Sequence, residues 1–312
     1  MQIDRGAYPD AQTPWEDLSW RSAALDWLDR ELEALGVREA GERRVRLRPW
    51  SVIVRVCGER PIWFKATSPG SAFEPALAEA LSRWTPEHVL TPYAVDCARG
   101  WSLLPDGGEL LRAQTLDARH WEEVLAQYAE LQRALVPRVD ELLRLGVPDA
   151  RDLVRLFNST VADNQTLGVG DRERLEAFRP RLVEWCAELD GFGIAATLDH
   201  ADLHDGQILV AGPARYTFFD WGDANVAHPF CSLLVAIDRA AEQLGPDVVP
   251  RLEDAYLEPW TAEHPRSDLR RAATLARRLS HLTRASSWGR LFPATTHIGD
   301  PERAAALLRL LD

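Results

Sequence analysis

The spacing of hydrophobic residues divides the 312-residue chain into a first part rich in strands and a second part rich in helices. The first amphipathic segment opens with a capping box, in which Thr13 is followed three residues later by Glu16, and leucines then recur at helical spacing until Gly36. This pattern predicts an opening helix with Pro14 at its first position.

Alternating and β-branched residues occupy the chain from Val45 to Ala66, with a turn at Cys57–Arg60. They predict a hairpin whose second strand carries Lys65 near its end. Three further elements are predicted before residue 105: a helix over Phe73–Trp84 and strands over Val89–Val95 and Trp101–Leu104.

A break at Pro105–Gly108 precedes mainly helical spacing. We interpret it as the hinge between a nucleotide-binding lobe, residues 1–105 with the leading helix, and a helical lobe, residues 106–312, with the catalytic loop and acceptor site. A second hairpin interrupts the helices, with strands over Gln207–Val210 and Tyr216–Asp220. The polar loops at its ends can bring Asp202 and Asp220 toward one site. Helices are predicted over Trp121–Leu131, Leu175–Leu189 and Phe230–Ala240.

The charge balance excludes several classes of protein. The chain has 36 Lys and Arg against 48 Asp and Glu, a net charge of −12, which opposes a nucleic-acid partner. No apolar run is long enough to span a membrane, and no basic-then-apolar signal opens the chain. The four cysteines are far apart in sequence and are expected to be reduced core residues. We therefore expect a cytoplasmic protein without a membrane partner.

Lys65 is the single lysine among the 36 basic residues. On a solvated surface Arg serves as well as Lys, so a general preference for Arg does not explain this exception. A compact ammonium is needed where a point charge holds a phosphate or forms a Schiff base. The lone lysine is thus a candidate phosphate clamp.

Transfer of a phosphoryl group needs a base near the acceptor hydroxyl, oxygen ligands for Mg²⁺ and a cation on the phosphates. Asp202 can be the base, and Asp220 with the amide oxygen of Gln207 can hold Mg²⁺, which prefers hard oxygen ligands. Lys65 can be the cation. Glu74, on the helix that follows, can hold its ammonium in place, with Glu79 as the competing carboxylate.

The segment from His200 to Gln207, with Asp202 at its third position, resembles the HxDxxxxN catalytic loop of the aminoglycoside phosphotransferase and choline kinase family. The segment Phe219–Asp223 resembles the metal-binding segment of that family, and 18 residues separate Asp202 from Asp220. Trp63–Lys65 followed by Phe73–Glu74 resembles its strand lysine and paired helix glutamate. The chain departs from the pattern at Gln207, where the family has Asn.

The resemblance implies an α+β, two-lobed protein-kinase-like fold with a small β-rich N-lobe and a larger, mainly helical C-lobe. It implies ATP and Mg²⁺ as cofactors, a structural role for His200, and adenine bound by the backbone near Leu103 and Leu104. Little chain separates Asp223 from the next helix, so a small-molecule acceptor fits better than a protein. The negative charge, with Asp205 near the base, favours an aminosugar, aminoglycoside or amino alcohol.

Two alternatives remain open from the sequence. The cluster of His200, Asp202, His204 and Asp205 could bind zinc in a metal hydrolase, and Gln207 could mark a nucleotide-binding but inactive regulator. ATP or GTP as donor and the oligomeric state are also open. Several side chains are candidates for touching the acceptor or supporting the site: His204, Asp205, Asp223, Trp221, Trp260 and Trp288.

Overall fold

The computed structural model describes residues 1–292 and 299–312. Its chain forms two compact units, one made of Met1–Gly107 with the described residues of Arg290–Gly299, the other of Gly108–Gly289 and Asp300–Asp312. Leu291 and Phe292 are both buried, and Phe292 joins the hydrophobic core of the first unit. The sequence gives no local signal for this return of the chain.

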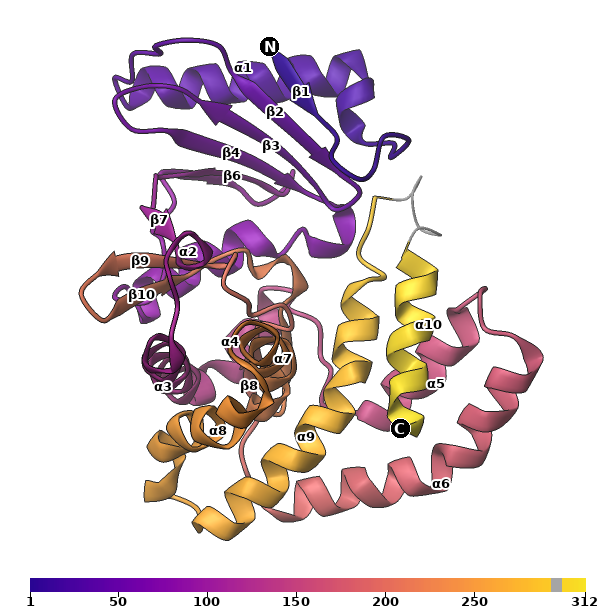
Figure 1. The fold of residues 1–312 in the computed structure, drawn as a ribbon. Coiled ribbons are helices and arrows are strands. Elements are labelled where there is room, and N and C mark those ends of the chain that lie inside the picture. Colours follow the sequence, from indigo (N-terminus) through magenta and orange to yellow (C-terminus); the bar gives the residue numbers. More distant parts are fainter. Residues whose placement is uncertain (293–298) are drawn as a thin grey trace. The chain divides into compact units, whose positions relative to one another are not determined.

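The first unit is built on a six-stranded sheet with the order β1-β2-β3-β4-β6-β5 (Figure 1). β1 runs parallel to β2, and the other neighbours are antiparallel. The strands are β1 (Gln2–Asp4), β2 (Arg44–Arg48), β3 (Ser51–Val56), β4 (Ile62–Thr67), β5 (Ala94–Asp96) and β6 (Trp101–Leu104). The predicted hairpin is therefore confirmed as β3 and β4.

Helix α1 (Leu18–Ala34) packs along one face of this sheet, and α2 (Glu74–Trp84) follows β4. The capping box of Thr13 and Glu16 is present, but it caps a short 3-10 turn at Pro14–Glu16. Asp17 then caps α1, because its carboxylate accepts the backbone N–H groups of Ser19 and Trp20. The opening helix thus exists and begins later than predicted.

The strand predicted over Val89–Val95 is wrong for most of its length, since β5 begins only at Ala94. Pro92 lacks the N–H that a ladder hydrogen bond needs. The expectation that all cysteines are core residues is also wrong: the four are free, but only Cys231 is buried and Cys97 is exposed.

The second unit is mainly helical, with α9 lying alongside α5 and α10 (Figure 1). Its helices are α3 (Ala118–Leu135), α4 (Val139–Arg144), α5 (Leu153–Asp163), α6 (Val169–Gly191), α7 (Leu233–Leu244), α8 (Val249–Leu257), α9 (Arg266–Ser287) and α10 (Asp300–Leu308). Its strands are β7 (Glu109–Leu110), β8 (Thr197–Asp199), β9 (Ile208–Gly212), β10 (Arg215–Phe218) and β11 (Asn225–Ala227). The predicted second hairpin is β9 and β10, which pair antiparallel with β7 on the free side of β9.

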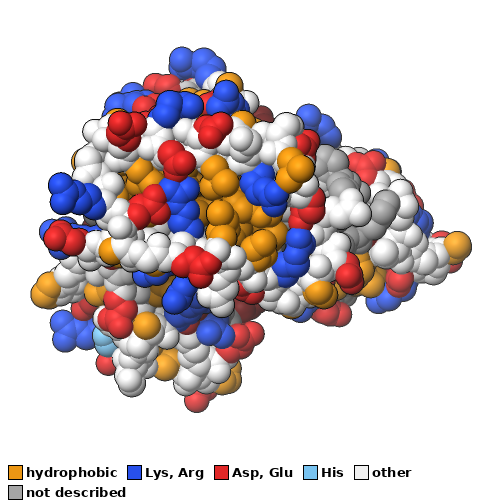
Figure 2. Space-filling view, turned by 90° about the horizontal axis from the view of Figure 1, so that it is seen from above, with side chains coloured by type: hydrophobic (Ala, Val, Ile, Leu, Met, Phe, Trp, Pro, Cys, Tyr) orange, Lys and Arg blue, Asp and Glu red, His pale blue; other side chains and the backbone are white. Residues whose placement is uncertain are grey.

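Within the described ranges, none of the helices has the length and apolar character to cross a membrane. Figure 2 shows acidic and basic side chains interspersed around an apolar area on the face that it draws. On this face the charged side chains are therefore of both signs.

Candidate active site

Lys65 and Glu74 form a buried ion pair in the first unit. Lys65 lies on β4, where its backbone is flanked by Ile53 of β3 and Ser102 of β6. Its Nζ is 2.6 Å from Oε1 of Glu74, the first residue of α2, and the two residues are only 7% and 6% exposed. A central strand thus positions Lys65, and the start of a helix positions Glu74. This is the pair that the sequence predicts.

The competing carboxylate, Glu79, is bound elsewhere. Its Oε2 lies 3.3 Å from Nη1 of Arg83 in an exposed pair one helical turn along α2. The two residues proposed for adenine binding lie at the end of β6. The carbonyl of Leu103 accepts the N–H of Tyr93, the residue before β5, and Leu104 is the last residue of β6. Adenine binding near these two residues stays a prediction.

Gln207 and Asp220 lie at the same end of the second hairpin. Gln207 immediately precedes β9 and Asp220 comes two residues after β10, whose last pair is Phe218 with Ile208. The N–H of Phe219 also donates to the carbonyl of Gln207 at 3.2 Å. No residue of 1–292 or 299–312 forms a hydrogen bond with the Gln207 side-chain amide. A residue with a carboxylate and a residue with an amide oxygen therefore lie at one end of the hairpin, and these are oxygen ligands of the kind that Mg²⁺ prefers.

His200 connects the loop of Asp202 to the loop of Asp220. It is fully buried, and its Nε2 lies 3.0 Å from the carbonyl oxygen of Phe219. A carbonyl can only accept, so Nε2 carries the proton. The ring also packs on the indole of Trp221, with centroids 4.7 Å apart, and burial lowers the pKa of His200. His200 is thus neutral and links the two loops, which is the structural role that the resemblance implies. Trp221 is buried against its ring.

Two residues other than glycine adopt left-handed backbone conformations in these loops. Ala201, directly before the candidate base, has φ of 59°, and Asp220 has φ of 67°. Each costs about 1 kcal/mol or more, and such strain persists where the surrounding structure enforces it, most often at functional sites. The N–H of Ala201 donates to Oδ1 of buried Asp199, which helps to hold this conformation.

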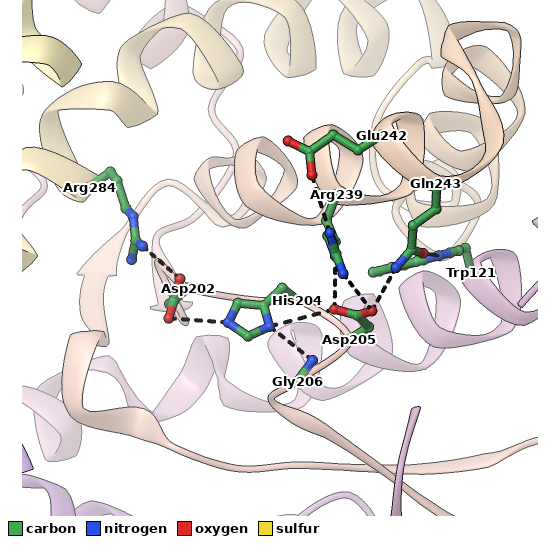
Figure 3. A network of polar contacts seen from close by, with 9 residues as sticks. All are labelled: Trp121, Asp202, His204, Asp205, Gly206, Arg239, Glu242, Gln243 and Arg284. Atoms are coloured by element: carbon green, nitrogen blue, oxygen red, sulfur yellow. Dashed lines mark hydrogen bonds and ion pairs between the residues drawn. The ribbon is translucent and has the colours of Figure 1, made fainter. Parts of the chain in front are cut away.

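Both carboxylate oxygens of Asp202 face nitrogen atoms (Figure 3). Oδ1 is 2.8 Å from Nη2 of Arg284 on α9, and Oδ2 is 3.6 Å from Nε2 of His204. Burial raises the pKa of Asp202 to about 6, against the opposing effect of the Arg284 guanidinium. Asp223 and Asp220 also raise it, so the acids that precede β9 and follow β10 are close enough to interact. A carboxylate with this pKa can accept a proton near neutral pH.

The orientation of His204 is fixed by a backbone contact. Gly206 donates its N–H to Nδ1 of His204 at 2.9 Å, so the proton of the neutral ring is on Nε2, the atom that faces Asp202. A Cβ at position 206 would lie 2.7 Å from the ring carbon Cε1 of His204, so only glycine fits here. Burial lowers the pKa of His204. His204 is therefore a neutral ring whose Nε2–H faces Asp202 at 3.6 Å, beyond hydrogen-bond distance.

Asp205 is not available to an acceptor, contrary to the sequence argument that its charge attracts one. It is 2% exposed and accepts hydrogen bonds from Arg239 at 3.0 Å and 3.3 Å and from Gln243 at 2.6 Å. Trp121 of α3 in turn donates to Gln243 (Figure 3). Asp205 thus anchors the catalytic loop to α7, and its charge is compensated.

Replacing Arg239 by Gln is expected to lower the free energy of unfolding by about 3 kcal/mol, because it leaves the Asp205 carboxylate buried without its cation. The matched control is Arg251→Gln, which breaks an exposed pair with Glu122 and is expected to cost less than about 1 kcal/mol. Urea denaturation measures both. Equal losses for the two variants would contradict the structural role of Asp205.

The sequence did not indicate two arginines that contact the His200–Gln207 loop, Arg284 and Arg239, or the buried pair of Asp199 with Ser232, 2.6 Å apart. The arginines lie on helices distant in sequence, and nothing distinguishes them from the many other arginines. Arg284 also lies 3.7 Å from Asp223, so that predicted acid joins the same cluster.

The three tryptophans proposed to line an acceptor pocket differ in environment. Trp221 packs against His200, and Trp260 is buried beside Phe230, with ring centroids 5.5 Å apart. Only Trp288 contacts the charged cluster among these three, because the guanidinium of Arg284 lies 5.6 Å from its ring centroid.

The metal-hydrolase alternative finds no support in these contacts. His200 donates to a carbonyl, and Asp205 is bound by Arg239. Across the described parts of the chain, no group of three or more His, Cys, Asp or Glu side chains is arranged to hold a metal ion. The dense cluster of these residue types is therefore divided among separate structural contacts.

Comparison with known proteins supports the phosphotransferase interpretation. The model of the phosphotransferase enzyme family matches residues 64–274. The fold is similar to macrolide 2'-phosphotransferase MphH from Brachybacterium faecium, with 18% identity over 91% of this chain and 98% of that chain and a TM-score of 0.54. It is also similar to a choline/ethanolamine kinase family protein from Mesorhizobium loti, with 16% identity, coverage of 92% and 98%, and a TM-score of 0.56.

A third similar structure is the gentamicin complex of APH(2")-IIa, with 14% identity over 92% of this chain and 97% of that chain and a TM-score of 0.58. No curated protein sequence matches the chain. The family match covers more than half of the sequence and includes Lys65, Glu74, Asp202 and Asp220. The chain therefore belongs to the phosphotransferase enzyme family, and it is a small-molecule kinase with a protein-kinase-like fold.

Proposed function

We propose that the protein transfers the γ-phosphate of ATP, with Mg²⁺, to a hydroxyl group of a small polar molecule. The single observation that carries this proposal is the arrangement at the end of the β9–β10 hairpin. A carboxylate with a pKa near 6, Asp202, lies within electrostatic reach of Asp220, whose hairpin end also holds the Gln207 amide. The buried Lys65–Glu74 pair supports the proposal from the first unit.

In the proposed reaction, Asp202 accepts the proton of the acceptor hydroxyl as its oxygen forms a bond to the γ-phosphorus. The bond from that phosphorus to the β-γ bridging oxygen breaks, and ADP leaves. Lys65 holds the phosphates, with Glu74 fixing its ammonium. Asp220 and Gln207 would bind the Mg²⁺ that neutralises charge on the β- and γ-phosphates. Arg284 orients the base.

The class of acceptor follows less directly. Two of the similar structures are named with an amine-bearing compound: the gentamicin complex of APH(2")-IIa and an ethanolamine kinase from Plasmodium vivax. In this chain, however, Asp205 and Asp223 each face an arginine. The acceptor proposed here is therefore defined by its hydroxyl group, and amine-bearing molecules are one class to be tested.

The proposal is tested by ADP formation with a panel of aminoglycosides, amino sugars, amino alcohols, macrolides and plain sugars. We expect at least one acceptor to stimulate ADP release, chelation by EDTA to abolish it, and added Mg²⁺ to restore it. GTP replaces ATP in a parallel series. Nucleotide binding without any turnover that depends on Asp202 would instead favour the inactive regulator.

The rate is expected to fall below about pH 6, because protonation of Asp202 removes the base. In kcat/KM the decline approaches about tenfold per pH unit on the acid side. Measuring kcat/KM from about pH 3 to about pH 9 locates this limb. An acid limb near the ordinary carboxyl pKa of 3.8 would show that the buried Asp202 is not the group that titrates.

A further inference from the structure

The acids around the candidate base are compensated by arginines rather than left for a cationic ligand. Asp205 is held by Arg239. Arg284 lies 2.8 Å from Oδ1 of Asp202 and 3.7 Å from Oδ2 of Asp223. A single guanidinium thus contacts both the carboxylate that would accept the proton and the acid of the loop that follows β10.

Arg284 is held firmly in this position by its own helix. The neighbouring residues Thr283 and Ala285 are buried in the second unit, and Thr283 donates its hydroxyl to the carbonyl of Ser280. The guanidinium also donates to the carbonyl of Ala201 at 3.3 Å and lies over the ring of Trp288. These contacts place a permanent positive charge beside the base.

The Arg284 side chain nevertheless remains 23% exposed. A guanidinium carries five N–H donors in a fixed planar arrangement, and the contacts with Asp202 and Ala201 use two of them. It can therefore donate to an oxygen atom of a ligand. An ammonium group in the same place would meet a like charge, and it would find Asp202 and Asp223 already paired.

We propose that Arg284 is the residue that determines acceptor specificity, an inference that rests on the proposed function. It selects molecules that present a hydroxyl or carboxylate oxygen, and not an ammonium group, next to the reactive hydroxyl. The oxygen accepts an N–H of Arg284 while the reactive hydroxyl donates to Asp202. Discrimination arises both from this hydrogen bond and from repulsion of the competing cation.

The test compares matched acceptors in which only the group beside one hydroxyl changes: glucose and glucosamine, which differ at C2, and ethylene glycol, ethanolamine and glycolate. Acceptor-dependent ADP formation gives kcat and KM for each, together with the best acceptor of the wider panel. We expect the wild-type protein to favour the hydroxyl or carboxylate member of a series. In Arg284→Gln the ratio of kcat/KM for the oxygen member to that for the amine member should fall by about tenfold or more.

Two further variants separate specificity from structural support. Arg284→Lys keeps the positive charge but loses the planar fork, so it should still disfavour amines while binding the oxygen members with a higher KM. Arg278 lies on the same helix, and its guanidinium contacts the ring of Trp185. Arg278→Gln should therefore leave the kcat/KM ratio of oxygen to amine acceptors unchanged. Circular dichroism checks that each variant is folded.

A best acceptor with an ammonium group beside its reactive hydroxyl would overturn the inference. So would an Arg284→Gln variant that slows all acceptors equally, because this would give Arg284 only a supporting role for Asp202. In both cases phosphoryl transfer itself would still stand. Absence of any Asp202-dependent ADP formation across the panel would instead reject the proposed function, and the specificity inference with it.

Discussion

Replacement of Asp202 by Asn is expected to lower kcat by about 100- to 10,000-fold, the contribution typical of a positioned general base. Asn fills the same space and its carbonyl oxygen can still accept from Arg284, so the fold should be retained. It cannot take the proton of the acceptor hydroxyl. Steady-state kinetics of ADP formation measure the loss, and nucleotide affinity should change little.

Asp223→Asn is the matched control for this experiment, since Asp223 is a second acid paired with Arg284 but is not the proposed base. It should retain most of kcat. Turnover of Asp202→Asn within a few-fold of the wild-type value would exclude Asp202 as the base, and an equal loss in both variants would point to the charge of the cluster rather than to proton transfer.

Replacing Lys65 by Ala should reduce turnover by about 100-fold or more, the effect of removing one charged donor that stabilises the transferred group. Lys65→Arg should also fail, because a planar guanidinium does not reproduce a compact ammonium at a residue that is only 7% exposed. Turnover at saturating acceptor and the KM for nucleotide measure the effect. Arg83→Ala, which breaks only an exposed pair with Glu79, should behave like the wild-type protein.

The Lys65→Ala substitution also leaves the Glu74 carboxylate buried without its cation, and this loss itself destabilises the fold. The double variant Lys65→Met with Glu74→Gln removes both charges and keeps similar volumes. It should fold and remain inactive. Near-normal turnover in either folded variant would remove Lys65 from the mechanism.

Local sequence patterns predict the elements that carry the site. Alternation gives the β3–β4 hairpin with Lys65 on its second strand, and helical spacing gives α2 with Glu74 at its start. The register of β9 and β10 brings Gln207 and Asp220 together, because two strands joined by a short turn have their outer ends side by side. These elements and their pairing depend on residues close in sequence, so the residue types and the spacing of hydrophobic positions are enough to predict them.

Long-range partners could not be predicted in this way. Arg284 reaches Asp202 from α9, and Arg239 neutralises Asp205 from α7, although neither arginine differs in sequence context from its neighbours. Phe292 likewise joins the core of the first unit from near the end of the chain. Such contacts are decided by how helices pack, and a helix's own period does not reveal which of its polar residues faces a loop elsewhere. The sequence therefore did not show that the carboxylate of Asp205 is paired with an arginine.

The central claim is that Lys65 and Asp220 serve the same metal-bound nucleotide. A crystal structure with Mg²⁺ and a non-hydrolysable ATP analogue tests it most directly. The account predicts the Lys65 ammonium on the phosphates, Asp220 and Gln207 as ligands of Mg²⁺, and a carboxylate oxygen of Asp202 facing the γ-phosphorus. A nucleotide whose phosphates touch only one of Lys65 and Asp220 would contradict it.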